Sequence, residues 1–385
     1  MLDVLVVGGG PAGLYSALLL AEEGFDVVVV EEHETLGAPT HCTGIVSEEL
    51  SELFKIPESV VLNRPTSCVI HSPTGRTFPL ASNGERIAVI DRGEFDRELG
   101  VSAQRAGVDI RTAFRAERIR VGPSSVHVDG PAGALSARGC ILACGVGYRL
   151  QRQLGLQLPS LFLHSAQCEV DASEMSVAVD LYIGREVAPE GFGWAVPVVR
   201  GERPRVKVGV AARGDAERRL HGLLGAPDVS RRLVSPPGTP VRRLLPVASA
   251  ARTYGHRVLV VGDAAGLTKP TTGGGVFYSL LSGLFAAETL TEALRRDRLE
   301  AGDLRGYEER WRARLGPHLW ISSWVRHLFT RLTDLELETL LDALASDDVQ
   351  RAIRDTARFN WHGDFIRAVV RQSGVKSTLF QAVLR

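Results

Sequence analysis

The feature that most constrains this chain is a glycine-rich turn at residues 8–13, which lies between two short apolar runs. Residues 3–7 lead into the turn, residues 14–23 carry apolar positions at helical spacing, and residues 25–31 form the second apolar run. Two strands that are apolar throughout and are joined by a helix are typical of a parallel sheet covered on both faces. The sequence therefore predicts an α/β protein that begins with a Rossmann-like domain.

The turn has the spacing of a dinucleotide-binding site. Gly8, Gly10 and Gly13 form G-x-G-x-x-G, in which the glycines allow a tight bend, close approach to a pyrophosphate and close packing of the helix. The helix that follows presents free N–H groups to the phosphates. Glu31 ends the second run 18 residues after Gly13 and is placed to accept hydrogen bonds from the adenosine ribose, which disfavours a 2′-phosphate. We therefore predict that this turn binds NAD or FAD.

A second segment favours FAD over NAD. The apolar run 257–261 ends at Gly262 and Asp263, where a carboxylate can accept hydrogen bonds from ribityl hydroxyls. The glycines at 273–275 then allow a second helix N-terminus to approach the pyrimidine end of a flavin, where negative charge accumulates on reduction. Pro270 and three consecutive glycines are poor helix formers, so a surface helix capped by Asp263 is the weaker alternative.

The length of 385 residues and the strand pattern indicate two or three folding units. We expect an α/β fold in which a Rossmann-like FAD-binding domain is joined to a mostly antiparallel β-sheet substrate domain and a C-terminal helical region. The expected parts are a first FAD-binding segment at 1–165, with a hairpin at 60–85 that contributes to the substrate domain, the substrate domain at 166–250, a second FAD-binding segment at 251–300 and the helical region at 301–385.

Charge and cysteine usage narrow the function classes. The 45 basic and 45 acidic residues cancel, so nothing favours a nucleic-acid partner. The five cysteines are odd in number and lack C-x-x-C spacing, which argues against disulfides and a zinc site and fits a reducing cytoplasm. The first apolar run starts almost at Met1, and no apolar run approaches the roughly 20 residues that span a bilayer. We therefore expect a cytoplasmic protein without a bound metal.

Four stretches resemble the flavoproteins with the p-hydroxybenzoate hydroxylase type of fold and, within them, the geranylgeranyl reductase family: residues 7–13, 37–47, 91–99 and 262–275. The second is the most specific, because these reductases carry a P-x-x-C-x-G turn there. The resemblance covers most of the chain and implies FAD-dependent reduction of carbon–carbon double bonds in the geranylgeranyl or polyprenyl (isoprenoid) chain of a lipid, quinone or diphosphate. It implies FAD contacts at Ala12, Glu31, Cys42, Gly44, Arg92, Ala116, Asp263, Gly275 and Val276, with Gly273 and Gly274 in the same loop.

The resemblance also implies a substrate site. Residues 182–197 are similar to the family's Y-x-W-x-F-P signature, which lines a long apolar tunnel, and give Phe192, Trp194 and Pro197 as substrate-binding residues. Phe192 stands in place of the tyrosine and Val196 in place of the phenylalanine, so a hydroxyl is lost while the apolar wall remains. By residue type alone, a core strand with one buried aromatic residue is the alternative.

Cys42 is the candidate catalytic residue. Reduction of an unactivated double bond needs a hydride at one carbon and a proton at the other, and a thiol or an ordered water can relay that proton. Two alternatives stay open: Cys42 is simply a small apolar residue of the interior, or His41 is the proton donor.

The electron donor is open between NAD(P)H and a ferredoxin. Cys144 stands where related hydroxylases carry an aspartate used in contacting NAD(P)H, and the chain has no second G-x-G-x-x-G.

The alternative functions are a flavin-dependent monooxygenase of an apolar substrate and a flavin electron-transfer protein without a small substrate. Residues 60–100 lack the lysine that a flavin halogenase needs there.

A stripe of apolar residues at 320–332, including Trp320 and Trp324, recurs at helical spacing. Such a stripe predicts a helix packed on the body of the protein. The alternative is an amphipathic helix in peripheral contact with a membrane, from which an isoprenoid substrate would enter.

Overall fold

The computed structural model describes residues 1–80, 84–372 and 374–375, and the chain divides into two compact units, each built from three segments. The first unit comprises Met1–Thr40, Arg92–Leu161 and Pro246–Pro317. The second unit comprises His41–Asp91, Phe162–Leu245 and His318–Arg385. Residues 41–91 fall in the second unit because their strands pair with one another and with its sheet.

The first unit is built on an eight-stranded sheet in which β8, β2, β1, β11 and β18 lie side by side and run parallel. At its edges β17 pairs antiparallel with β18, and β9 and β10 extend antiparallel from β11. The strands are β1 (Leu2–Val7), β2 (Val27–Val30), β8 (Asp109–Arg111), β9 (Arg118–Val121), β10 (Val126–Gly130), β11 (Gly133–Leu142), β17 (Tyr254–Gly255) and β18 (Val258–Val260). The predicted parallel sheet, begun by two apolar strands, is confirmed.

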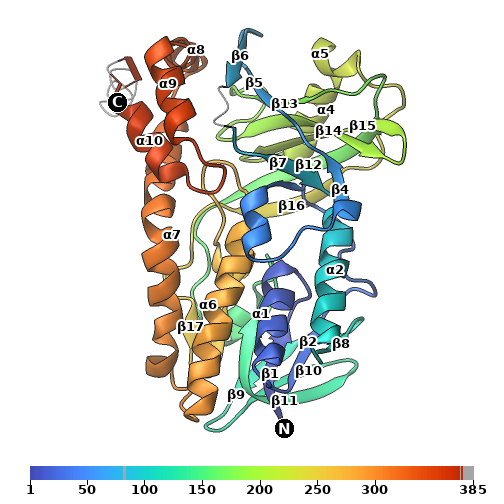
Figure 1. Cartoon of the computed structure of the whole chain (residues 1–385), viewed down its shortest axis with the longest axis vertical. Helices are drawn as coiled ribbons and strands as arrows, with labels where there is room; N and C mark the ends of the chain where they lie inside the picture. The colour runs from blue at the N-terminus through green and yellow to red at the C-terminus, as the bar shows by residue number, and fades with distance from the viewer. Residues whose placement is uncertain (81–83, 373, 376–385) are drawn as a thin grey trace. The chain divides into compact units, whose positions relative to one another are not determined.

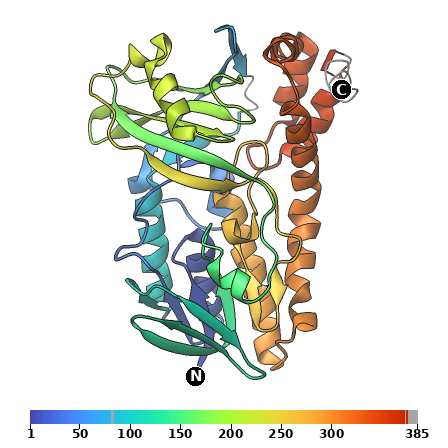
Figure 2. The same ribbon diagram turned by 180° about the vertical axis from the view of Figure 1, so that it is seen from behind.

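Three helices pack together on this sheet, with α1 lying between α2 and α6 (Figure 1). Close packing of α6 on α1 depends on Gly283, because a Cβ there would lie 2.8 Å from the Ala12 carbonyl oxygen. Seen from behind, the short α3 lies at the other side of the sheet, near β9 (Figure 2). The helices are α1 (Pro11–Glu22), α2 (Arg92–Arg105), α3 (Arg149–Gln153), the 3-10 helix η3 (Gly262–Ala265), α6 (Val276–Arg295) and the first part of α7 (Ala301–Phe329).

The second unit is built on a seven-stranded sheet of order β16-β12-β15-β14-β13-β5-β6. Strands β12, β15, β14 and β13 pair antiparallel, as predicted, and the predicted hairpin of β5 and β6 joins them through a parallel pairing of β5 with β13. The strands are β5 (Ser67–His71), β6 (Thr77–Leu80), β12 (Phe162–Asp171), β13 (Ala178–Tyr182), β14 (Phe192–Arg200), β15 (Arg203–Ala212) and β16 (Val241–Pro246).

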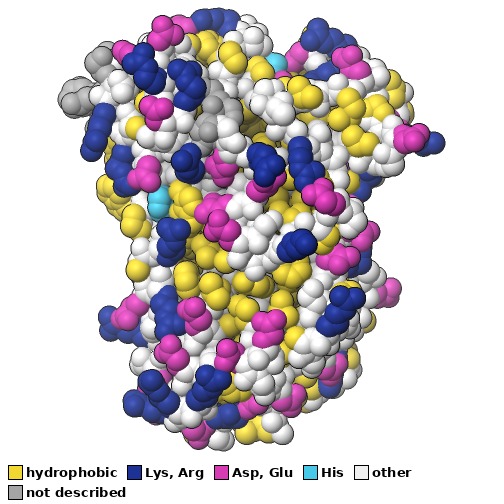
Figure 3. Space-filling model, viewed as in Figure 1, with side chains coloured by type: hydrophobic (Ala, Val, Ile, Leu, Met, Phe, Trp, Pro, Cys, Tyr) yellow, Lys and Arg dark blue, Asp and Glu magenta, His cyan; other side chains and the backbone are white. Residues whose placement is uncertain are grey.

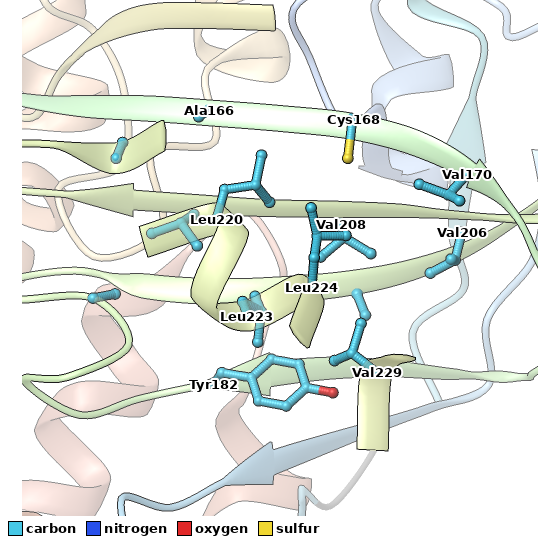
Figure 4. Close-up of a cluster of buried hydrophobic side chains, with 14 of the residues drawn as sticks. Ala166, Cys168, Val170, Tyr182, Val206, Val208, Leu220, Leu223, Leu224 and Val229 are labelled. Atoms are coloured by element: carbon cyan, nitrogen blue, oxygen red, sulfur yellow. The ribbon is translucent and has the colours of Figure 1, made fainter. Parts of the chain in front are cut away.

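The two faces of this sheet have different covers. Leu220, Leu223 and Leu224 of α4 pack on one face, against Val206 and Val208 of β15 (Figure 4). A small antiparallel sheet covers part of the other face, where its strands contribute apolar side chains to a cluster with β13 and β14. These elements are β3 (Ile45–Ser47), η1 (Glu48–Glu52), η2 (Glu58–Val60), β4 (Val61–Asn63), β7 (Ile87–Ile90), α4 (Ala216–Gly225) and α5 (Pro227–Ser230).

The predicted C-terminal helical region is present as the end of α7 and three further helices, α8 (Asp334–Leu344), α9 (Asp347–Thr356) and α10 (His362–Val370). Thr333 and Glu336 form a capping box that starts α8. Within the described residues, no helix combines the length and the hydrophobicity that crossing a membrane requires.

Candidate functional site

The glycine-rich turn lies between β1 and α1 in the first unit. Gly8 has a φ of +113°, and a Cβ there would lie 2.3 Å from the Ala143 carbonyl oxygen. A Cβ at Gly13 would lie 2.1 Å from the Gly8 carbonyl oxygen, so both positions exclude any side chain. Gly10 differs, because a Cβ there would meet nothing within 4 Å. The turn therefore packs tightly inward and leaves open space beside Gly10.

The N-terminus of α1 is suited to an anion. The helix begins at Pro11, its N-cap Gly10 has no side chain to bond the first N–H groups, and its first turn contains no acidic residue. Backbone N–H groups and the positive end of the helix dipole therefore remain available to a phosphate. A pyrophosphate fits this turn, which includes Ala12 and Gly13.

The Glu31 carboxylate is fixed against the turn from both sides. Its Oε2 accepts a hydrogen bond from Gly9 N at 2.7 Å, and its Oε1 accepts one from His33 N at 3.0 Å and also bonds the His33 ring. Oε2 accepts only one of these bonds and can accept a further one, so a ribose hydroxyl of the prediction is compatible with this geometry. Ala116 lies in the adjacent segment, where Phe114 N donates to the Glu31 carbonyl oxygen at 2.8 Å.

Arg92, at the start of α2, forms an ion pair with Asp96 one turn later. The Arg92 Nη2 lies 2.6 Å from Asp96 Oδ2, and Asp96 is only 5% exposed. Burial raises the pKa of Asp96, although the Arg92 charge opposes that rise. The guanidinium is therefore held in one orientation. Nothing in the sequence analysis identified Asp96, although an i,i+4 acid–base pair at a helix start is a readable signal.

Asp263 lies in η3 and faces the start of α6. A Cβ at Gly275 would lie 3.1 Å from Asp263 Oδ1, so the carboxylate occupies the space that a side chain would fill. Val276 begins α6, whose N-cap Gly275 makes no side-chain hydrogen bond and whose first turn has no acid. Gly273, with a φ of +66°, donates its N–H to the Lys269 carbonyl oxygen at 2.7 Å. These contacts fit a ribityl chain and a flavin at this helix end.

Cys144 follows β11, and its Sγ donates to the Val7 carbonyl oxygen at 3.5 Å. Burial, helped by the negative charges of Glu31 and Glu32, raises the pKa of Cys144 to about 12. The thiol is therefore neutral at physiological pH and does not reproduce the charge of the aspartate that it replaces.

Cys42 and Gly44 belong to the second unit, whereas the other predicted cofactor residues lie in the first. Gly44 has a φ of +89°, and a Cβ there would lie 2.2 Å from the Ile90 carbonyl oxygen, so it fits closely on β7. Gly44 N donates to Cys42 Sγ at 3.3 Å. The turn therefore holds the sulfur in place through a backbone N–H.

Phe192 and Trp194 share one face of β14, with ring centroids 5.7 Å apart. The indole lies over Gly209, where a Cβ would come within 2.2 Å of the ring. Pro197 has the opposite strand parity and pairs with Val206 of the core under α4, so its ring faces the other side of the sheet. Its carbonyl oxygen accepts a hydrogen bond from Asn63 Nδ2 at 2.9 Å. The structure thus brings together Phe192 and Trp194 without Pro197.

Two polar residues that the sequence analysis did not single out connect this face to the Cys42 turn. Gln167 Oε1 accepts hydrogen bonds from Trp194 Nε1 at 3.1 Å and from Thr43 Oγ1 at 2.7 Å. Lys207 Nζ donates to the Thr43 carbonyl oxygen at 2.8 Å. The sequence offers little signal for either residue, because β12 and β15 also carry other polar and charged residues. Their partner Thr43 is also too far away in sequence to be inferred.

Similarity to known proteins covers nearly the whole chain. A family model described as an FAD binding domain matches residues 1–55. Digeranylgeranylglycerophospholipid reductase 2 of Methanopyrus kandleri is 31% identical over 375 residues, which cover 91% of this chain and 92% of that protein. The digeranylgeranylglycerophospholipid reductase of Methanosarcina acetivorans is 30% identical over 369 residues, which cover 89% of this chain and 88% of that protein.

Solved structures share the fold. A geranylgeranyl bacteriochlorophyll reductase-like protein from Thermoplasma acidophilum has a TM-score of 0.86 at 22% identity and covers 99% of both chains. Halogenase PltM in complex with phloroglucinol and FAD has a TM-score of 0.68 at 17% identity, covering 99% of this chain and 90% of that one. The full-length sequence relatives decide between these two: this chain belongs to the geranylgeranyl reductase family of FAD-dependent oxidoreductases.

Proposed function

We propose that this protein reduces the carbon–carbon double bonds of geranylgeranyl chains carried by a glycerophospholipid. The observation that carries the proposal is the similarity, over 91% of the chain, to a reductase named for such a lipid. The half-buried rings of Phe192 and Trp194 support it, because together they offer apolar surface on which a prenyl chain can pack.

Reduced FAD, when bound, supplies the hydride. The N-terminus of α1 would hold the pyrophosphate, Glu31 would accept from the adenosine ribose and Asp263 would accept from the ribityl chain. Cys42 would give its proton to the alkene carbon that does not receive the hydride. One C–H bond would then form from the hydride and the other from the proton.

Anaerobic turnover of the lipid tests this function. The purified flavoprotein is reduced photochemically, digeranylgeranylglycerophospholipid is added, and flavin absorbance and lipid mass are followed together. We expect flavin reoxidation without oxygen and a gain of two hydrogens per double bond. A flavin that stays reduced until oxygen is admitted would contradict the proposal and favour a monooxygenase.

The electron donor is NAD(P)H or a ferredoxin. The neutral thiol of Cys144 lacks the carboxylate that the related hydroxylases use with NAD(P)H, which favours a ferredoxin. Stopped-flow reduction of the oxidised protein distinguishes them. We expect reduction by reduced ferredoxin to be faster than by NADPH at equal concentrations; rapid reduction by NADPH alone would assign the nucleotide instead.

The lipid substrate makes peripheral membrane contact part of this proposal. Trp320 and Trp324 of α7 are 70% and 40% exposed, and residues 310–333 contain no acidic residue. Figure 3 shows hydrophobic side chains at the surface over α7. Exposed tryptophans beside arginines suit the headgroup region of an anionic bilayer.

Co-sedimentation with vesicles of phosphatidylglycerol tests this contact. Replacing Trp320 and Trp324 together by alanine should release most of the bound protein, whereas Val234→Ala, at a side chain that is 63% exposed elsewhere, should not. Equal sedimentation of the wild type and both variants would contradict a membrane contact through α7.

A further inference from the structure

Gln167 joins two segments of the second unit that lie far apart in the sequence. Its Oε1 accepts hydrogen bonds from Trp194 Nε1 at 3.1 Å and from Thr43 Oγ1 at 2.7 Å. An indole N–H can only donate, so the amide oxygen must face it, and the Thr43 hydroxyl then donates to the same atom. One side-chain oxygen therefore holds both the ring on β14 and the residue next to Cys42.

The indole reaches Gln167 by crossing β15 at a glycine. Gly209 of β15 lies directly opposite Gln167 of β12 on one side and directly opposite Trp194 of β14 on the other. Residues opposite each other in a sheet share a face, and a Cβ at Gly209 would come within 2.2 Å of the ring. The absence of a side chain on β15 thus lets the ring lie over this strand and its N–H bond the next one.

Thr43 has a second anchor on the same face of the sheet. Lys207 lies two positions before the glycine of this row, so its side chain leaves β15 on the same side. Its Nζ donates to the Thr43 carbonyl oxygen at 2.8 Å. The Cys42 turn is therefore bonded to the sheet through Thr43 alone at two points, the hydroxyl by Gln167 and the backbone by Lys207.

We propose that Gln167 is a positioning residue for the reduction, which fixes the Trp194 ring relative to the Cys42 turn. The inference rests on the proposed function, in which the prenyl chain packs on this ring and Cys42 supplies the proton. A misplacement of about 1 Å can cost a reaction about a hundredfold in rate. An anchor shared by the ring and the turn therefore controls how well the alkene meets the thiol.

The anchor itself is tested without lipid. The flavin-loaded full-length protein contains five tryptophans; their indole N–H signals are recorded by proton–nitrogen NMR, and Trp194→Phe identifies the signal of Trp194. In Gln167→Met this N–H loses its acceptor, so its signal should shift and its exchange with solvent should become about tenfold faster. Gln167→Glu keeps an acceptor oxygen and should retain a protected signal. An unchanged Trp194 signal in Gln167→Met would overturn the proposal.

Anaerobic kinetics with digeranylgeranylglycerophospholipid separate positioning from a purely structural role. Thr43→Val frees the hydroxyl side of the turn and leaves the ring bonded, so it should lower kcat by about tenfold with little change in KM. Trp194→Phe removes the indole N–H, so it should raise KM by about three- to tenfold with a smaller effect on kcat. Gln167→Met should show both changes, whereas Gln167→Glu should keep both constants near their wild-type values.

Gln104→Met, at an exposed glutamine of α2, is the matched control and should keep every signal and constant of the wild type. Flavin absorbance and thermal unfolding report whether each variant is folded. Wild-type kcat and KM in Gln167→Met would show that the anchor is only structural and would reject the positioning role. The NMR measurement contains no lipid, so its failure leaves the proposed function standing. A confirmed anchor in a wild-type protein that does not reduce the lipid would instead reject the proposed function, and the positioning role with it.

Discussion

At the scale of single residues, Gly13 shows how little freedom the cofactor turn has. In Gly13→Ala the new methyl would lie 2.1 Å from the Gly8 carbonyl oxygen, so α1 must move away from β1. We expect a loss of about 1–3 kcal/mol of stability and at least tenfold weaker FAD binding, measured by fluorescence titration of the apoprotein. Gly306→Ala, in α7 with open space around it, is the control and should bind FAD normally. Normal binding by Gly13→Ala would contradict the assignment of this turn.

Asp180 makes the stability of the protein depend on pH, and the direction of this dependence can be predicted. Burial opposes its ionisation, but hydrogen bonds from His71 at 2.8 Å and Arg232 at 2.7 Å outweigh burial and lower the pKa of Asp180. The stabilisation is therefore present above the unfolded carboxyl pKa and is lost as pH falls through the lower folded value. Asp180→Asn should lower stability by about 1–3 kcal/mol at pH 7. The difference in stability between Asp180→Asn and the wild type should shrink towards about pH 3, as measured by thermal unfolding. The exposed Glu202→Gln is the control; a gap that stays constant with pH would refute this account.

At the scale of elements, the pair β14 and β15 makes a specific prediction for the substrate wall. Gly209 gives Trp194 the room to lie against the sheet, and a Cβ there would come within 2.2 Å of the indole. Gly209→Ala should displace the ring and raise the KM for the prenyl lipid by about three- to tenfold, with about 0.6–1.4 kcal/mol of binding lost. The flavin spectrum should not change. Gly238→Ala, where a Cβ meets nothing within 4 Å, is the matched control. An unchanged KM in Gly209→Ala would mean that Trp194 does not contact the substrate.

Some of the helices and strands could be predicted from the sequence, whereas other features of the fold could not. Local patterns identified β1, the glycine turn and the start of α6, because apolar runs and glycine spacing are encoded within a few residues. The parallel pairing of β5 with β13 was not predicted, since it joins segments about a hundred residues apart and no local pattern specifies it. The same reason explains why Gln167 and Lys207 were missed. Pro197 is a different case, because strand parity, which is readable in the sequence, already separates it from Trp194.

At the scale of the whole molecule, we expect substitutions in the two units to cause different defects, one in FAD binding and the other in reaction with the lipid. Asp263 lies in the unit that carries the glycine turn and α1, whereas Trp194 lies in the unit with the antiparallel sheet. We expect Asp263→Ala to weaken FAD binding at least tenfold, since the ribityl hydroxyls lose their acceptor. Trp194→Ala should retain FAD and raise the KM for the lipid, because the apolar wall is truncated.

The double variant Asp263→Ala/Trp194→Ala tests whether these roles are independent. If the two side chains do not interact, the free-energy changes of the single variants add to within about 0.5 kcal/mol. Its FAD dissociation constant should therefore equal that of Asp263→Ala, and its lipid KM at saturating FAD should equal that of Trp194→Ala. Val234→Ala, at an exposed side chain of the second unit, should change neither constant. If Trp194→Ala alone loses the flavin, the tryptophan serves the cofactor as well as the lipid, and the separation of roles between the two units is wrong.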